Sequence, residues 1–387
     1  MLQFLPCIAA LFVGSALAGA YPPDAVDKLA EESMSKLKDY LAKNPQGGCT
    51  LETAVKRKEW SDLAEKERQE YTSAVLCLMG KPGLMTAQAP GAKSRFDDYV
   101  AVHIQQTPRN HGSTFFLPWH RYYLWHYENA LRTECNYTGF QPYWNWDRYA
   151  KDPVNSPLFN GNESSMSGNG AKVAHQGIPI PGAPRPYNLI PAADGGGCVT
   201  TGPFKNMSVN LGPIAPTLQV KANPRSDGLG YNPRCLRRDV NKNSAAVTTA
   251  NYTLDLITKN NNVYWFQTVM EGQFPQGKWG VHAGGHYTVG GDPAGDFYVS
   301  PGDPAFWLHH AMIDRVWWIW QLQDLAKRLT EVSMTRTMNN MPPSANGTLD
   351  DLSNLGVMAP DVKVRELMTT MVLGEKMLFS LCTNRVA

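Results

Sequence analysis

The chain has 387 residues, of which 43% are hydrophobic and 18% charged, so it can bury a sizeable core and overall disorder is excluded. Its 36 Lys and Arg residues nearly balance its 34 Asp and Glu residues. The formal net charge of +2 gives no electrostatic reason to expect binding to nucleic acid or to a membrane surface.

The first twenty residues, MLQFLPCIAALFVGSALAGA, carry no charged side chain. Their apolar run is too short to span a membrane and is typical of the core of a secretory signal peptide. Small residues predict cleavage after Ala18 or Ala20. We therefore expect a signal peptide over 1–20 and a secreted, extracellular protein with a single domain over 21–387.

The cysteines outside that segment also suit an oxidising compartment. They are Cys49, Cys77, Cys135, Cys198, Cys235 and Cys382. Their even number predicts three disulfides, with a pairing that the sequence leaves open. No two of them form a CxxC motif, so a zinc ribbon is unsupported. Sequons for N-glycosylation occur at Asn136, Asn162, Asn206, Asn251 and Asn346.

Helical periodicity begins directly after the expected cleavage site. Residues 24–80 read as helices, with apolar residues largely on one stripe. A second helix is expected over 93–106, closed by Pro108. A third begins at Pro118, a favourable first-turn position, and runs towards residue 132.

The next stretch, 151–240, breaks this pattern. It holds 12 Gly and 12 Pro residues, which predicts a long irregular excursion with short strands. A fourth helix follows it, with Asp303 as N-cap and Pro304 at the first helical position. Its tryptophans Trp317, Trp318 and Trp320 are expected in the core. These elements predict one mainly α domain.

Eight of the nine histidines fall into two clusters, each of which includes a helix. The candidate metal ligands are His103, His111 and His120 in the first cluster, and His282, His286 and His310 in the second. Two helices and the loop between them can bring the first three imidazoles to one point. In HAGGH, the small residues between the two histidines allow a close approach of backbone or ligand. Asp314, one turn after His310, is placed to hydrogen-bond a ligand histidine.

Six imidazoles without a thiolate disfavour an iron–sulfur cluster or a structural zinc site. The HAGGH motif also lacks the general-base Glu of a zinc peptidase. Ligation by imidazoles alone suits copper, zinc or nickel, and copper has the highest intrinsic affinity of the three for nitrogen ligands. Two facing sites of three histidines each would hold two coppers, with open positions that can bind O₂ and accept two electrons from a substrate.

The segments HGSTFFLPWHRYYLWHYENAL and HAGGHYTVGGDPAGDFYVSPGDPAFWLHHAMIDRVWWIW resemble the type-3 copper family of tyrosinases, catechol oxidases and, more distantly, haemocyanins. PYWNWD at 142–147 and the stretch 57–78 resemble it too. The histidine spacings are most similar to those of short secreted fungal polyphenol oxidases. The resemblance implies a four-helix bundle that holds two copper ions, one on each histidine cluster. We expect no C-terminal shielding domain of the kind that longer members carry, because only 77 residues follow His310.

Some positions depart from the family pattern. Arg109 stands where many members carry a cysteine that forms a thioether with the second copper ligand, so we expect no thioether. Members that hydroxylate monophenols well often carry Asn where this chain has Ala283. Glu271 is the best candidate for the glutamate that holds an activating water. The resemblance places Ala283, Tyr287 and Phe297 at the substrate entrance.

The other three histidines are interpreted as non-ligands. His309 lies on the wrong helix face to share the metal of His310, so it should be structural or support a ligand. His126 lies well round the helix from His120 and should be structural. His175, in the Gly/Pro-rich excursion, is expected at the surface.

The leading functional hypothesis is oxidation of o-diphenols to o-quinones, with O₂ reduced to water and weak hydroxylation of monophenols. The expected partners are O₂ and phenolic small molecules, with neither nucleic acid nor membrane, and His286 is a candidate for orienting the substrate ring by stacking. Alternatives within the enzyme class are a full tyrosinase or an o-aminophenol oxidase. A haemocyanin-like O₂ carrier would need a residue that plugs the site, and a zinc hydrolase would need a general base that the clusters lack.

Overall fold

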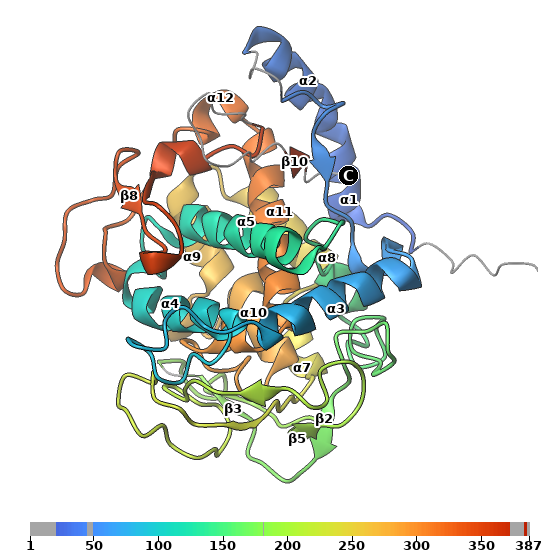
Figure 1. The fold of residues 1–387 in the computed structure, drawn as a ribbon. Helices are drawn as coiled ribbons and strands as arrows, with labels where there is room; N and C mark the ends of the chain where they lie inside the picture. Colours follow the sequence, from blue (N-terminus) through green and yellow to red (C-terminus); the bar gives the residue numbers. More distant parts are fainter. Residues whose placement is uncertain (1–20, 45–48, 181, 372–382, 385–387) are drawn as a thin grey trace, which may run out of the picture.

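In the computed structural model, the described residues are 21–44, 49–180, 182–371 and 383–384 (Figure 1). The expected signal peptide and Cys382 lie outside them. The described part of the chain is mainly helical, as predicted. Within it, no helix has the length and the apolar character that a membrane crossing requires.

The core consists of the helices that carry the histidines or lead into them. They are α4 (Arg95–Asn110), α5 (Phe116–Cys135), α10 (Gly280–Val289) and α11 (Ala305–Leu322). Helix α5 packs against α4 and α11, and α10 packs against α11. Figure 1 shows them at the centre of the molecule, with α1 and α2 at one end and β2, β3 and β5 at the other.

Further helices cover this core. They are α1 (Ala25–Glu32), α2 (Met34–Lys43), α3 (Glu65–Gly80), α6 (Trp146–Tyr149), α7 (Lys242–Ala245), α8 (Ala250–Lys259), α9 (Val263–Glu271) and α12 (Leu325–Arg328). Short 3₁₀ helices are η1 (Trp60–Asp62), η2 (Phe274–Gln276), η3 (Ser300–Gly302), η4 (Met338–Asn340), η5 (Gly356–Met358) and η6 (Val364–Leu367). Helix α3 packs on α4 and α5, and α9 packs on α10.

The strands are short and pair only in twos. Antiparallel pairs join β2 (Gly170–Lys172) to β5 (Gly196–Val199), β3 (Ile178–Pro179) to β4 (Leu189–Ile190), β6 (Ser208–Val209) to β7 (Arg234–Cys235), and β8 (Leu352–Ser353) to β9 (Val362–Lys363). A parallel pair joins β1 (Val55–Lys56) to β10 (Thr383–Asn384). Strands β2 to β7 fall in 151–240, which confirms the predicted irregular excursion.

Local sequence explains how the core helices begin. Ser94 and Asp97 form a capping box at α4, each side chain accepting a hydrogen bond from the other residue's backbone N–H. Helix α11 begins at Ala305 with Pro304 as its N-cap, one residue later than predicted, although the Asp303 carboxylate still accepts a hydrogen bond from the backbone N–H of Ala305. Helix α5 begins at Phe116, two residues before the predicted start, and Pro118 lies in its first turn, where no intrahelical N–H is needed.

Two further helix predictions are wrong. Pro108 does not close α4, which runs on to Asn110. A proline so near the helix end removes only one intrahelical hydrogen bond. Residues 24–80 are not continuously helical, because Trp60 pairs with Tyr143 through its backbone N–H and sits in η1 rather than on α3. Tertiary pairing with the segment around 142–147 therefore overrides the apolar stripe read from the sequence.

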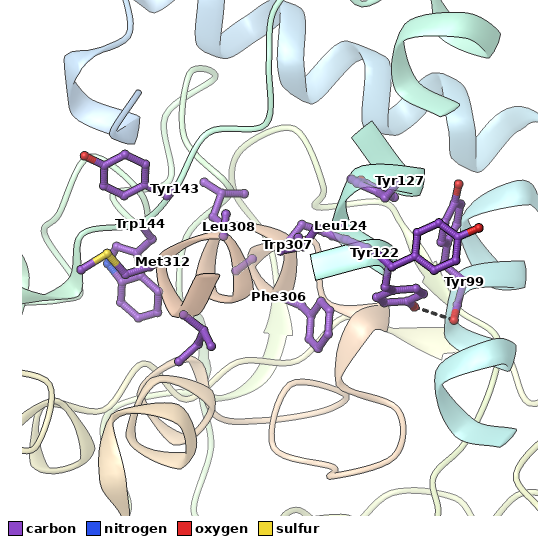
Figure 2. Packing of buried hydrophobic residues seen from close by; sticks show 14 of the residues in the cluster. Tyr99, Tyr122, Leu124, Tyr127, Tyr143, Trp144, Phe306, Trp307, Leu308 and Met312 are labelled. Atoms are coloured by element: carbon purple, nitrogen blue, oxygen red, sulfur yellow. Dashed lines mark hydrogen bonds between the residues drawn. The ribbon is translucent and has the colours of Figure 1, made fainter. Parts of the chain in front are cut away.

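Aromatic side chains of α4, α5 and α11 pack against one another (Figure 2). The ring of Tyr127 on α5 stacks on Trp307 of α11, with centroids 3.6 Å apart and planes inclined by 6°. Tyr99 of α4 meets Trp307 edge-on, with centroids 5.4 Å apart. The three tryptophans predicted in the core, at 317, 318 and 320, are all buried. Stacked and edge-on rings contribute stability beyond their buried area, so the helices are held rigidly around the histidines.

Two disulfides fix the periphery of this core. Cys77–Cys135 ties α3 to the end of α5, and Cys198–Cys235 ties β5 to β7. Cys49 is disulfide-bonded as well. The prediction that the cysteines form disulfides is thus confirmed for every cysteine in the described residues.

The expected surface position of His175 is wrong. Its side chain is only 10% exposed, and its Nε2 lies 3.3 Å from a carboxylate oxygen of buried Asp239. Its Nδ1 accepts a hydrogen bond from the backbone N–H of Gly177. The excursion folds back on itself, so this histidine is covered although residues 171–174, which precede it, are exposed.

Candidate metal centre

The first histidine cluster is assembled by α4, the loop after it and α5. His103 comes from α4, His111 directly follows α4, and His120 lies on α5. One ring nitrogen from each lies within 4.8 Å of the others, and all three side chains are buried. The three residues predicted to meet at one point do meet.

Backbone carbonyls fix the orientation of these rings. The Nδ1 atoms of His103 and His120 lie 2.8 Å and 2.7 Å from the carbonyl oxygens of Tyr298 and Phe116. A carbonyl oxygen only accepts, so each Nδ1 carries the proton and each Nε2 keeps its lone pair. Both Nε2 atoms are buried without a hydrogen-bond partner among the described residues. This arrangement is typical of histidines that ligate a metal through Nε2.

The second cluster brings three ring nitrogens into contact. The Nε2 atom of His286 lies 3.2 Å from Nε2 of His282 and 3.1 Å from Nε2 of His310. One proton can satisfy only one of these two contacts, whereas a shared metal ion satisfies all three nitrogens. The prediction of two sites with three histidines each therefore agrees with the geometry.

The glycines of HAGGH allow α10 to pack closely against α11. A Cβ atom added at Gly285 would lie 2.2 Å from the ring of His309. That ring in turn contacts the backbone carbonyl of His282 through Nε2, at 3.0 Å. His309 belongs to the second cluster by distance. Because its Nε2 is engaged by a carbonyl, it supports His282, in line with its predicted role.

The two clusters face each other closely enough for a dinuclear centre. The rings of His120 and His310 are stacked, with centroids 4.4 Å apart and planes inclined by 17°. The rings of His111 and His282 are 6.1 Å apart. Metal ions held by the two clusters would therefore lie next to each other.

Asp314 does not take the role predicted for it. Its carboxylate accepts a hydrogen bond from Nε of Arg121 at 2.7 Å and lies 3.5 Å from Arg57, while Nδ1 of His310 has no partner in the described structure. Arg121 directly follows His120 on α5. Asp314 does lie one turn after His310 on α11, as the spacing indicates. A buried guanidinium, however, competes more strongly for its carboxylate than a neutral imidazole does.

Burial keeps the imidazoles neutral. It lowers the pKa of His103 to about 4 and holds the pKa values of the other five candidate ligands well below the usual range. Neutral histidines are the form that binds metal. Six such nitrogens without a thiolate or carboxylate among them fit copper best.

A cavity of about 720 Å³ opens onto His111, His282 and His286. The three residues predicted at the substrate entrance, Ala283, Tyr287 and Phe297, all line it. The ring of Phe297 lies 4.5 Å from that of His111. The cavity is also lined by a segment that the sequence did not single out, through Met334, Thr335, Met338, Asn339 and Asn340. This segment has no periodicity or motif that could have indicated it.

Glu271, the candidate for the glutamate that holds an activating water, lines the same cavity. It accepts hydrogen bonds from the backbone N–H of Gly112, at 2.8 Å, and from the side-chain amide of Gln267, at 2.6 Å. Burial raises its pKa to about 7. A carboxyl group with such a pKa can both accept and donate a proton near neutral pH.

Comparison with known proteins agrees with this geometry. The model of the common central domain of tyrosinase matches residues 93–323, which include both histidine clusters. The chain belongs to the tyrosinase family. The cofactor of this family is a dinuclear type-3 copper centre, and the residues at the two clusters fit it.

Relatives of this tyrosinase family member cover most of its length. The tyrosinase-like protein orsC of Emericella nidulans is 40% identical over 88% of this chain and 94% of its own. The N-acetyl-6-hydroxytryptophan oxidase ivoB of the same organism is 36% identical over 83% of this chain and 90% of its own. A polyphenol oxidase from Thermothelomyces thermophila, solved as a mutant, is 42% identical and superposes with a TM-score of 0.82 over 90% and 94% of the two chains.

The first prediction concerns the expected absence of a thioether at His111. Arg109 occupies the family's cysteine position and donates a hydrogen bond to the carbonyl of Leu352, and all cysteines in the described residues form disulfides. Peptide mapping of the non-reduced protein should recover the peptide with His111 at its unmodified mass. A cross-linked peptide that contains His111 and a cysteine would contradict this.

A second prediction concerns pH and a histidine outside the ligand set. Burial lowers the pKa of His126 to about 4, whereas the unfolded chain has a value near 6.5. The unfolded state therefore binds more protons in this window, and the free energy of unfolding should fall as the pH drops from about 6.5 towards 4. The variant His126→Gln should show a shallower fall in urea midpoint between pH 7 and pH 5. Identical pH dependence in both proteins would refute the assignment.

Proposed function

We propose that this protein is a secreted dicopper oxidase that converts o-diphenols to o-quinones, two diphenols being oxidised for each O₂ reduced to two waters, and that it hydroxylates monophenols slowly. The observation that carries the proposal is the pair of facing histidine sites at the end of an open cavity. Copper held by the histidines would supply O₂ binding and accept the electrons of the diphenol.

The residues of the chain position the substrate. The ring of Phe297 lies beside that of His111. It would therefore border the path by which the aromatic ring of a substrate reaches the histidines. His286 is half-buried and lines the cavity, so its ring is available for stacking. Glu271 is the group that can accept the proton of a phenol hydroxyl or orient a water, because its pKa is raised to about 7.

The open cavity also helps to separate oxidation of o-diphenols from the alternative functions, an O₂ carrier and other oxidase activities. An O₂ carrier needs a residue that closes the site, whereas about 720 Å³ remain accessible here. Full tyrosinase or o-aminophenol oxidase activity stays a second candidate, because Glu271 lines the cavity and a volume of about 720 Å³ can hold a bulky phenol. Secretion is supported by the disulfides Cys77–Cys135 and Cys198–Cys235, which form in oxidising compartments.

The proposal is tested by elemental analysis of the purified protein and by initial rates on a panel of catechols, monophenols and o-aminophenols. Two coppers per chain and highest rates on catechols are expected. Zinc in place of copper, one metal per chain or no oxidation of any catechol would contradict it.

A third prediction isolates the cause of the weak monophenol activity. Ala283 offers no hydrogen bond to a water or hydroxyl at the cavity. Ala283→Asn should raise the rate on tyramine relative to dopamine by roughly threefold to tenfold, a modest share of what a positioned proton acceptor can contribute. Ala283→Leu, of similar size but without an amide, is the matched control. Equal tyramine and dopamine rates in the unmodified protein would contradict the proposed slow hydroxylation of monophenols.

A further inference from the structure

One wall of the cavity consists of Met334, Thr335, Met338, Asn339 and Asn340, here called the distal wall. It is tied to the loop that carries His111. The backbone N–H of Asn339 donates to the carbonyl of Gly112, at 3.0 Å, and that of Thr114 donates to the carbonyl of Thr335, at 3.0 Å. The distal wall is therefore fixed relative to the histidines and can select what enters beside them.

Its backbone is held in an unusual conformation. Met334, Asn339 and Asn340 have φ values of 70°, 51° and 60°, in the left-handed region that residues other than glycine rarely adopt. Asn tolerates this region, but Met does not favour it, so the surroundings must hold Met334 in place. Gln267, which also binds Glu271, contributes by placing its side-chain amide 3.2 Å from the Met334 sulfur. Strain of this kind concentrates at functional sites.

The chemistry of the cavity excludes one kind of substituent. Among the described residues that line it there is no Lys, Arg or Asp, and Glu271 is its one carboxyl group. A carboxylate at the distal wall, at the end of a substituent whose ring faces the histidines, would lose water without a Lys or Arg side chain to bind, and burying such an unpaired charge is costly. Met334 and Met338 instead offer apolar, adaptable surface, and the side chain of Asn339 offers an amide.

The volume also indicates a large substrate. A phenol ring occupies only part of about 720 Å³, a size in the range of pockets that hold drug-sized ligands. A ring placed with its hydroxyl groups at the histidines leaves part of this volume for a substituent.

We propose that the distal wall selects phenols that carry a large, uncharged substituent with a hydrogen-bonding group, such as an ester or an amide, over phenols whose substituent ends in a carboxylate. This inference rests on the proposed oxidation of diphenols. Met338 provides the apolar contact, and the amide of Asn339 binds the polar group of the substituent.

The test compares three catechols on the copper-loaded full chain at pH 7: catechol itself, 3-(3,4-dihydroxyphenyl)propionic acid and the N-methylamide of that acid. The saturated linker keeps the two substituted rings electronically alike. The amide should exceed the acid in kcat/KM by at least about tenfold, mainly through KM. Equal values, with catechol oxidised normally, would overturn the inference and leave the proposed function standing, whereas no oxidation of catechol would overturn both.

Two variants locate the selectivity. Met338→Arg places a cation in the distal wall and should raise kcat/KM for the acid about tenfold relative to the amide. Met341→Arg is the matched control, because Met341 is 70% exposed and does not line the cavity. Asn339→Gly removes the amide while tolerating the positive φ, and should raise KM for the N-methylamide but not for catechol. Equal shifts in the two arginine variants, or an unchanged KM in the glycine variant, would contradict the role of the distal wall.

Discussion

Replacing His310 with alanine should remove one of the two coppers and nearly all oxidase activity. Its Nε2 lies 3.1 Å from Nε2 of His286, and its ring stacks on His120 of the facing cluster. Loss of an outer partner of a ligand typically lowers metal affinity or activity by about 10- to 100-fold, so loss of a ligand itself should exceed that range. Elemental analysis and the initial rate on catechol measure both effects, and His120→Ala should behave alike.

His126→Ala is the matched control, since this histidine lies on α5 with His120 but points elsewhere. Its Nδ1 is hydrogen-bonded to the hydroxyl of Tyr99, at 2.9 Å, and not directed at the metal centre. The variant should keep both coppers and its catechol activity. If it lost copper as His310→Ala does, the assignment of ligands to the two clusters would be wrong.

Replacing Asp314 with alanine should destabilise the fold by about 3–5 kcal/mol, the usual cost of removing one partner from a buried ion pair. Arg121 is fully buried, and its Nε lies 2.7 Å from the Asp314 carboxylate. A second nitrogen of Arg121 donates to the carbonyl of Leu367, at 2.9 Å, so the pair joins α5, α11 and the segment after α12. Urea unfolding of the copper-loaded protein measures the effect.

Asp350→Ala is the control, because this carboxylate is exposed and paired only with exposed Lys363 and Arg365. Its removal should leave the unfolding midpoint unchanged. The comparison also separates two roles for Asp314. If it acted on His310 directly, copper affinity would fall at unchanged stability, whereas a role through Arg121 predicts that stability falls. The first outcome would contradict the observed ion pair.

The sequence by itself determined the candidate ligand histidines and the helices that carry them. Spacing placed His103 and His120 on two helices joined by the loop with His111, and α4 and α5 have this arrangement. The start of α11 was predicted to within one residue, because the contact of Asp303 with the backbone N–H of Ala305 is local in sequence. Patterns of this kind depend on contacts within one or two helical turns, which single-sequence reasoning reaches.

Only the tertiary structure decided which distant residues meet. Asp314 binds Arg121 rather than His310, and His175 is covered by its contact with Asp239. The distal wall reaches the cavity from beyond α12, about 220 residues after His111 in the chain. No periodicity encodes such contacts, because they depend on how rigid helices and irregular segments pack in three dimensions, where a buried charge takes the strongest partner within reach. Local spacing therefore predicted the histidines of this centre, whereas long-range packing determines the shape of its cavity.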